Sequence, residues 1–156
     1  RRILKEHGDE PLPDVAELLL MFAARSINVN NAILPALNEG TWVISDRFTD
    51  STRAYQGGGR GLPRERIARL EQFVQGDFRP DLTLLLDVPV EVGLARAGKR
   101  GALDRFEQEQ VGFFERVRQC YLGIVREHTG RYRVVDASQP LQQVQEQLSE
   151  FLKQVA

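Results

Sequence analysis

An acid and a base stand side by side after an apolar stretch of this chain. Asp46 and Arg47 directly follow residues 41–45, Thr-Trp-Val-Ile-Ser. In open α/β sheets, ligands bind where the strands end, and the apolar stretch would place the pair at such a point. An Asp there can orient Mg²⁺ or its water, and an adjacent Arg can fork onto a phosphate. The pair predicts phosphoryl chemistry; the alternative is a surface ion pair worth about 0–1 kcal/mol.

A glycine-rich segment, residues 57–61, follows the pair, with Tyr55 and Gln56 directly before it. Glycines let backbone N–H groups approach a ligand closely, so we expect a flexible loop on the ligand side. The alternative is an ordinary loop, in which Tyr55 would act only as an anchor for the hinge.

Cations gather in a third segment, residues 96–109. Its charged side chains around a glycine-bounded turn include Arg96, Lys99, Arg100, Asp104, Arg105 and Glu107. A solvated turn is the usual explanation for such a run. The alternative is a mobile lid whose arginines neutralise charge on a transferring phosphoryl group, an effect worth about 10³–10⁵ in rate.

Three apolar runs predict parallel strands, at residues 42–45, 82–86 and 132–135. The residues that follow them are all acids, Asp46, Asp87 and Asp136. Helical patterns lie between the runs and predict βαβ units, and so an α/β fold with a parallel sheet flanked by helices. Asp87 either begins the next helix as a cap or belongs to a phosphate network.

Helical spacing of apolar residues predicts five further elements. They are a helix from about Asp14, which Pro35 kinks or ends, and helices over residues 63–74, 90–98, 106–126 and 141–155. Asp14 can cap the first of them, because its carboxylate can accept from the free N–H groups of the first turn.

Composition narrows the class of protein. With 156 residues and 42% hydrophobic content, the chain can form one domain with a core. A net charge of -1 argues against general nucleic-acid binding. One Cys and 2 His exclude a disulfide framework and a structural zinc site. The sequence shows neither a membrane span nor a signal peptide, so we expect a cytoplasmic protein whose partners are neither membranes nor nucleic acids.

Two of these segments resemble one enzyme family. The run DRFTDSTRAYQGGGRG over residues 46–61 and the pattern R-x-x-x-R-G-x-L-D-R-x-E over residues 96–107 are similar to those of thymidylate kinases. The latter pattern resembles the lid of the bacterial type, in which the catalytic cation sits in the lid. The resemblance extends from Glu17 onward. It implies a P-loop nucleoside monophosphate kinase fold, transfer of the γ-phosphoryl of ATP to dTMP with Mg²⁺, and a homodimer.

The resemblance also implies roles for residues around the acceptor nucleotide. Arg47 would grip the phosphate of dTMP, and Asp46 would serve the Mg²⁺ and phosphate network. Arg25, on the first long helix, would bond the exocyclic oxygen of thymine. The side chain stacked on the base would be Phe22 or, at the position many relatives use for an aromatic, Met21. A core role is the alternative for Phe22.

Three more residues complete the implied acceptor pocket. Tyr55 would pack near the sugar edge and clash with a ribose 2′-hydroxyl, which favours deoxyribose by exclusion. Thr52 and Gln56 would bond the edge of the thymine ring.

On the donor side, the resemblance implies that Arg100 is the catalytic cation, assisted by Arg96 and Arg105. Ala137 and Ser138 follow the last predicted strand and resemble the loop beside the adenine of ATP. The alternative for that loop is helix capping, because Asp-Ala-Ser-x-Pro suits the start of a helix.

The sequence contains no G-x-x-x-x-G-K-S/T motif. It opens on Arg1, and residues 1–7 are typical of a helix already under way. We therefore expect residues 1–156 to be a single, incomplete domain that lacks the N-terminal strand, P-loop and helix. That strand lies in the middle of the sheet in P-loop kinases of this kind, so a polypeptide truly starting at Arg1 should aggregate, bind ATP poorly and not phosphorylate dTMP. The alternatives are a non-catalytic nucleotide-binding fragment and a sister kinase acting on another nucleotide.

Overall fold

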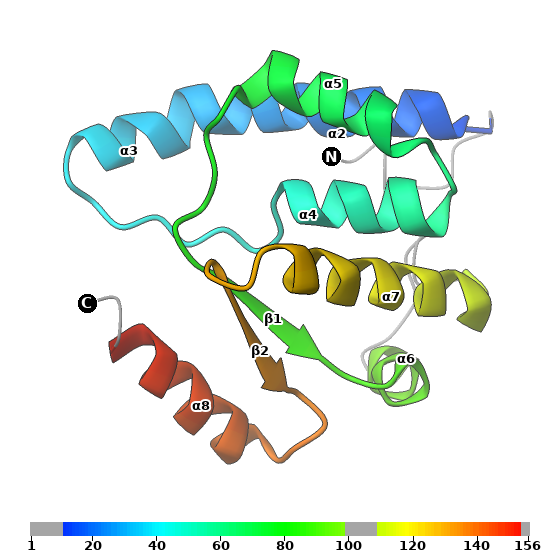
Figure 1. The fold of residues 1–156 in the computed structure, drawn as a ribbon, viewed down its shortest axis with the longest axis vertical. Helices are drawn as coiled ribbons and strands as arrows, with labels where there is room; N and C mark the ends of the chain where they lie inside the picture. The colour runs from blue at the N-terminus through cyan, green and yellow to red at the C-terminus, as the bar shows by residue number, and fades with distance from the viewer. Residues whose placement is uncertain (1–10, 99–108, 154–156) are drawn as a thin grey trace.

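The computed structural model describes residues 11–98 and 109–153 and shows helices around a short parallel sheet (Figure 1). The elements in chain order are α2 (Asp14–Asn28), the π-helical η1 (Val29–Ile33), α3 (Leu34–Asn38), α4 (Thr49–Thr52), the π-helical η2 (Arg53–Gly59), α5 (Arg64–Gln75), β1 (Thr83–Asp87), α6 (Val90–Gly98), α7 (Val111–Glu127), β2 (Tyr132–Asp136) and α8 (Leu141–Lys153).

The two strands pair in parallel, with Thr83 opposite Tyr132 and Asp87 opposite Asp136. Two of the three predicted strands are therefore confirmed, each with its end shifted by one residue. The connection between them runs through α6 and α7, so the predicted βαβ arrangement is also confirmed. Helix α8 packs against β2 on the side away from α7 (Figure 1).

The third predicted strand, residues 42–45, is wrong. These residues carry no strand in the structure, and the side chains of Trp42 and Ile44 are 67% and 92% exposed. An apolar run becomes a strand only when another strand hydrogen-bonds to it, and the part of the chain that the structure describes places none beside this segment. The sheet of the described residues thus has two strands.

The predicted helices at residues 63–74, 90–98 and 141–155 correspond to α5, α6 and α8. Helix α7 begins at Val111, later than the predicted residue 106, and residues 106–108 and 154–155 lie outside the described ranges.

Pro35 interrupts the first long helix as predicted. It stands in the first turn of α3, directly after the π-helical turn η1. A proline ring clashes with the carbonyl four residues earlier in a regular α-helix, and a wider π turn relieves such crowding. The helical path ends at Asn38.

Residues 57–59 of the glycine-rich segment are helical and do not form the predicted flexible loop. Residues 53–59 form η2, which continues α4 without a break and packs against α7. A Cβ on Gly58 would lie 2.7 Å from the Cβ of Cys120, and one on Gly59 would overlap the ring of Phe113. These glycines let two helices approach closely, so the triple glycine serves helix packing rather than backbone contact with a ligand.

Helices α4 and η2 lie between two apolar clusters. Leu18 and Phe22 of α2 pack with Ile67 of α5 in one cluster. Ala54 of η2 packs with Phe113 and Val117 of α7 in the other. Each large apolar side chain that is fully buried stabilises the fold by about 1.5–3 kcal/mol. Figure 1 shows the result, with α4 and η2 enclosed between the α2 and α5 pair and α7.

Candidate active site

Arg25 joins α2 to α4. Its guanidinium lies between the rings of Phe22 and Phe48, 5.2 and 5.3 Å from their centroids. One nitrogen, Nη2, donates to the hydroxyl of Thr52 at 3.0 Å and to the carbonyl of Phe48 at 3.1 Å. Burial lowers the pKa of Arg25 to about 10, although the carboxylates of Glu71 and Asp50 oppose the shift, so the group is a cation at neutral pH.

The other nitrogen of that guanidinium, Nη1, is buried and has no hydrogen-bond partner within the described residues. A buried donor without a partner costs about 1–3 kcal/mol or more when charged. Such an atom calls for an explanation, and a bound water, ion or ligand group would supply its missing partner.

Gln56 has a buried acceptor without a partner in the described ranges, as Arg25 has a buried donor. Its Nε2 donates to the Glu17 carboxylate at 2.7 Å, and the two residues are only 1% and 0% exposed. Its Oε1 is buried and has no donor among the residues that the structure describes. Thr52 and Gln56 are four positions apart on one helical path, so both face α2. The structure therefore brings together Arg25, Thr52 and Gln56, three of the predicted base-contacting residues.

Arg47 has an unusual backbone. Its φ is 70°, in the left-handed region that costs a non-glycine residue about 1–3 kcal/mol. The Ser45 hydroxyl donates to the carbonyl of Arg47 at 2.9 Å, and the Arg47 guanidinium lies 4.8 Å from the centroid of the Tyr55 ring. Both Asp46 and Arg47 are exposed. Strain of this kind is typical of functional positions, and it presents the guanidinium beside a residue of the predicted sugar pocket.

Tyr55 is half-buried, with its ring in edge contact with Phe113 at 6.0 Å between centroids. Met21 is half-buried on α2, four positions from both Glu17 and Arg25. Phe22 is 2% exposed within the core cluster and touches Arg25 by its ring face. Of its two alternatives, this position favours the core role.

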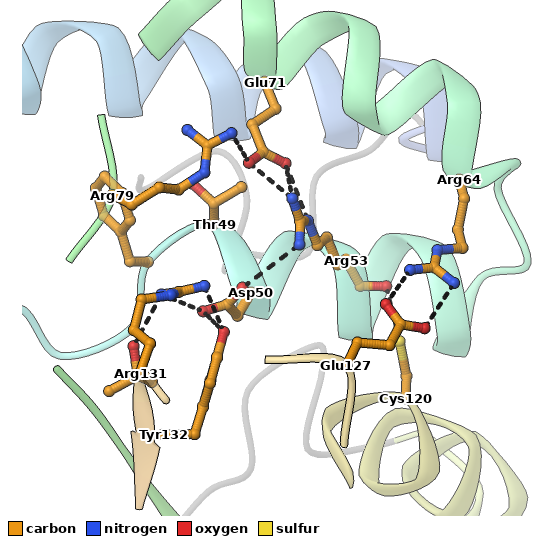
Figure 2. A network of polar contacts seen from close by, with 12 residues as sticks. Thr49, Asp50, Arg53, Arg64, Glu71, Arg79, Cys120, Glu127, Arg131 and Tyr132 are labelled. Atoms are coloured by element: carbon orange, nitrogen blue, oxygen red, sulfur yellow. Dashed lines mark hydrogen bonds and ion pairs between the residues drawn. The ribbon is translucent and has the colours of Figure 1, made fainter. Parts of the chain in front are cut away.

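A network of charged side chains links η2 to α5 and α5 to α7 (Figure 2). The carboxylate of Glu71, on α5, is 1% exposed and accepts from Arg53 of η2 at 2.9 and 2.8 Å. It also forms an ion pair with Arg79 at 2.7 Å. Arg64 of α5 forks onto Glu127 of α7 at 3.1 and 2.7 Å. The bonds from Arg53 to Glu71 fix the helix that carries Thr52 and Gln56 against α5, and the Arg64–Glu127 pair joins α5 to α7.

Asp50 ties the same helix to the amino end of β2. It accepts from the Tyr132 hydroxyl at 2.5 Å and pairs with Arg131 at 3.6 Å (Figure 2). Burial raises the pKa of Tyr132, and the bond to Asp50 raises it further, so the phenol stays a hydrogen-bond donor at neutral pH.

The loop after β2 is organised separately. Ser138 donates to Asp136 from its N–H at 2.9 Å and its hydroxyl at 2.5 Å. Donors from Gln139 and Ser138 lower the pKa of Asp136. Arg96, predicted in the lid, instead donates to the carbonyls of Ala137 and Ser138 at 2.6 and 3.3 Å. In this structure Arg96 supports the predicted adenine loop.

The candidate residues thus fall into two groups. Asp50 holds the helix that carries Thr52 and Gln56 near the first residue of β2. The loop around Ser138 follows the last residue of that strand, about 13 Å away along it. The guanidinium of Arg118 donates to both carboxylate oxygens of Asp87, at 2.7 and 2.8 Å. Within residues 11–98 and 109–153, Asp87 forms no bond to Arg25, Thr52 or Gln56. Arg100 and Arg105 lie outside the described residues.

Sequence reasoning missed the buried acids Glu17, Asp50 and Glu71. One signal was available for Glu17, because it stands on the face of α2 that Leu18 and Phe22 bury. A charged residue at a core-facing helical position needs a partner in the interior.

Comparison with known proteins shows to which family this chain belongs. A profile of the family described as thymidylate kinase matches residues 1–148. Proteins named thymidylate kinase are 59% identical in Ectopseudomonas mendocina (strain ymp) and 54% identical in Alcanivorax borkumensis, over 97% and 99% of this chain. The alignments cover 72% and 74% of those relatives. The chain belongs to the thymidylate kinase family.

Membership of the thymidylate kinases confirms the predicted family and, with it, the P-loop nucleoside monophosphate kinase fold. The part of this thymidylate kinase that the structure describes consists of helices and a two-stranded parallel sheet. No helix in those ranges combines the length and apolar character that crossing a membrane requires.

Proposed function

We propose that this thymidylate kinase transfers the γ-phosphoryl group of ATP to dTMP, giving dTDP and ADP. The observation that carries the proposal is the pair of buried, unpartnered atoms at the contact of α2 with α4 and η2, the donor Nη1 of Arg25 and the acceptor Oε1 of Gln56. Thymine presents an acceptor, O4, beside a donor, N3–H. The two atoms therefore complement the edge of this base.

Arg47 supplies the grip on the acceptor phosphate. The residue is exposed, and its strained backbone holds the guanidinium next to Tyr55. A guanidinium can form two parallel bonds to phosphate oxygens, which fixes the direction of the phosphate as well as its charge. Tyr55 stands at the sugar, where its bulk excludes a 2′-hydroxyl.

Asp46 is the residue on the acceptor side that would serve a magnesium ion. Mg²⁺ is usually bound through one or two carboxylates with phosphate oxygens and waters, rather than by a cage of protein ligands. An exposed carboxylate beside a phosphate-binding Arg fits that requirement, and no group of three His, Cys, Asp or Glu side chains suited to a metal occurs among the described residues. When bound, the ion would neutralise charge on the phosphates.

On the donor side, Ala137 and Ser138 stand beside the adenine, and Arg96 braces their carbonyls. Arg100 is the cation that acts on the transferring group, with Arg105 in support. Their place in a lid over residues 96–109 rests on the sequence pattern alone.

Two further expectations belong to this proposal. A homodimer is supported by apolar side chains exposed on α2, with Val15 at 48%, Leu19 at 51% and Ile27 at 63%. Light scattering on the purified protein tests it. A cytoplasmic location is supported by the use of ATP as donor, and fractionation of the source cells tests it.

The reaction is tested with the full-length protein, ATP, Mg²⁺ and one monophosphate at a time from dTMP, dUMP, dCMP and dGMP, with the diphosphate identified by mass. We expect the highest kcat/KM with dTMP. A higher value with another nucleotide would establish a sister kinase, and binding without turnover of any would establish a nucleotide-binding protein.

A further inference from the structure

We propose that Glu17 is a positioning residue that fixes the orientation of the Gln56 amide and so determines which pyrimidine edge the enzyme accepts. The inference rests on the proposed function, because it assumes that Gln56 faces the base. It adds a residue that would not itself touch the substrate.

The first step is the chemistry of the buried pair. A carboxylate offers only acceptors, so the group of Gln56 that points at it must be the donor Nε2. The observed 2.7 Å bond has this arrangement. If the amide turned over, two oxygens would face each other at a site where the two residues are 0% and 1% exposed, and such a contact is repulsive. The Glu17 carboxylate therefore excludes one of the two amide orientations.

The second step is what holds Glu17 in place. The Nε of Arg60 lies 3.6 Å from the Glu17 carboxylate and 3.6 Å from Asp14. Arg60 also pairs with Glu109 and lies over the ring of Phe113, 4.9 Å from its centroid. The cation is thus fixed from several elements and anchors the carboxylate.

The third step is the consequence for the base. With Nε2 turned to Glu17, Gln56 presents the acceptor Oε1, and Arg25 presents the donor Nη1. A 4-oxo pyrimidine with a proton on N3, such as thymine or uracil, matches both atoms. Cytosine has a donor at C4 and an acceptor at N3, so it opposes both. Glu17 would therefore act against cytosine nucleotides without distinguishing thymine from uracil.

The test compares substrate ratios in the full-length enzyme carrying E17Q. An amide opposite Gln56 can accept or donate, so both orientations of Gln56 become available. We expect the ratio of kcat/KM for dTMP to that for dCMP to fall at least tenfold. The ratio for dTMP to dUMP should stay within about twofold, because the two bases share the edge concerned. The kcat at saturating dTMP should change much less than the dCMP ratio.

Two variants separate positioning from a general loss of structure. E65Q removes an exposed carboxylate of α5 that has no part in this arrangement, and it should leave both ratios unchanged. The exchange E17Q/Q56E places a carboxylate at position 56 that only accepts, with the new amide at position 17 donating to it. It should restore the preference for dTMP over dCMP that E17Q loses.

An unchanged dTMP to dCMP ratio in folded E17Q would overturn the inference, as would a folded E17Q/Q56E enzyme that lacks the preference. The E17Q/Q56E variant still tests the inference if E17Q alone proves too unstable to assay. Q56A separates the role of Glu17 from that of Gln56. If Q56A loses the preference and E17Q keeps it, Glu17 has no positioning role but the proposed site stands; if Q56A also keeps it, Gln56 does not face the base.

Discussion

The guanidinium of Arg25 donates a hydrogen bond to the hydroxyl of Thr52 at 3.0 Å, across 27 positions of the chain. This bond crosses from α2 to α4 and uses only one of the two terminal nitrogens of the Arg. The other nitrogen is buried without a partner in the described part of the protein. One side chain therefore links α2 to α4 and also holds a buried donor that no described residue satisfies.

Replacing Arg25 by Lys should weaken dTMP binding. A single ammonium cannot reproduce the fork that serves Thr52 and the base together, and one charge-assisted bond is worth about 1.5–3 kcal/mol. We expect KM for dTMP to rise more than tenfold while KM for ATP changes little. R66K, at an exposed position of α5, is the matched control. Equal KM values for dTMP in R25K and R66K would contradict the role of Arg25.

R47A should lower kcat/KM for dTMP by a few kcal/mol of transition-state stabilisation, since each bond to phosphate contributes about 1.5–3 kcal/mol. The KM for ATP should move much less. Removal of the positive φ strain by R47G would favour the fold but not the activity, so R47G should be as impaired as R47A. Steady-state kinetics like those of wild type in either variant would remove Arg47 from the phosphate site.

Tyr55 should act by bulk rather than by its hydroxyl. We expect Y55F to keep the preference for a deoxyribose substrate and Y55A to relax it, because the smaller side chain leaves room for a 2′-hydroxyl. The measurement is the ratio of kcat/KM for dTMP to that for ribothymidine monophosphate. The assignment fails if that ratio is the same in Y55A and in wild type.

R100A should lower kcat far more than it raises KM for dTMP. A cation that acts on the transferring group has its effect mainly when charge redistributes between donor and acceptor. R105A should show a weaker version of the same effect. A loss of less than about tenfold in the single-turnover rate of R100A would place the catalytic cation elsewhere, since arginines in this role contribute much more.

E71Q should destabilise the protein by about 2–3 kcal/mol, because it leaves the guanidinium groups of Arg53 and Arg79 with a neutral partner at a site that is 1% exposed. E65Q, on the exposed side of the same helix, is the control and should change the free energy of unfolding by less than about 0.5 kcal/mol. Urea denaturation of both variants checks this. Equal midpoints would show that the network of Figure 2 does not hold η2 to α5.

The helices and two strands were predictable because their signal is local. The apolar spacing of residues 141–155 and the run at residues 132–135 each fit one kind of element, and α8 and β2 follow them closely. The run at residues 42–45 has the same apolar character, but a strand also needs a partner strand, and that requirement is not written in the run itself.

The conformation of the triple glycine also depends on residues far away in the sequence. Gly57 to Gly59 permits a loop as readily as a closely packed helix, and the ring of Phe113 and the side chain of Cys120, on α7, decide for the helix. No local pattern relates residues that are this far apart in sequence.

The candidate site was predictable in its residue types but not in its supports. Arg25, Thr52 and Gln56 were expected at the base, and the structure brings them together. Glu17 was missed, because its meaning depends on Gln56, 39 positions away. The supporting bonds of a site are long-range contacts, which only the fold reveals.

A crystal structure of the full-length enzyme with dTMP tests the central claim most directly. We predict thymine between α2 and the helix formed by α4 and η2, with O4 within about 2.7–3.2 Å of Nη1 of Arg25 and N3 at the same distance from Oε1 of Gln56. A base bound elsewhere, or one whose O4 and N3 contact neither atom, would contradict the account.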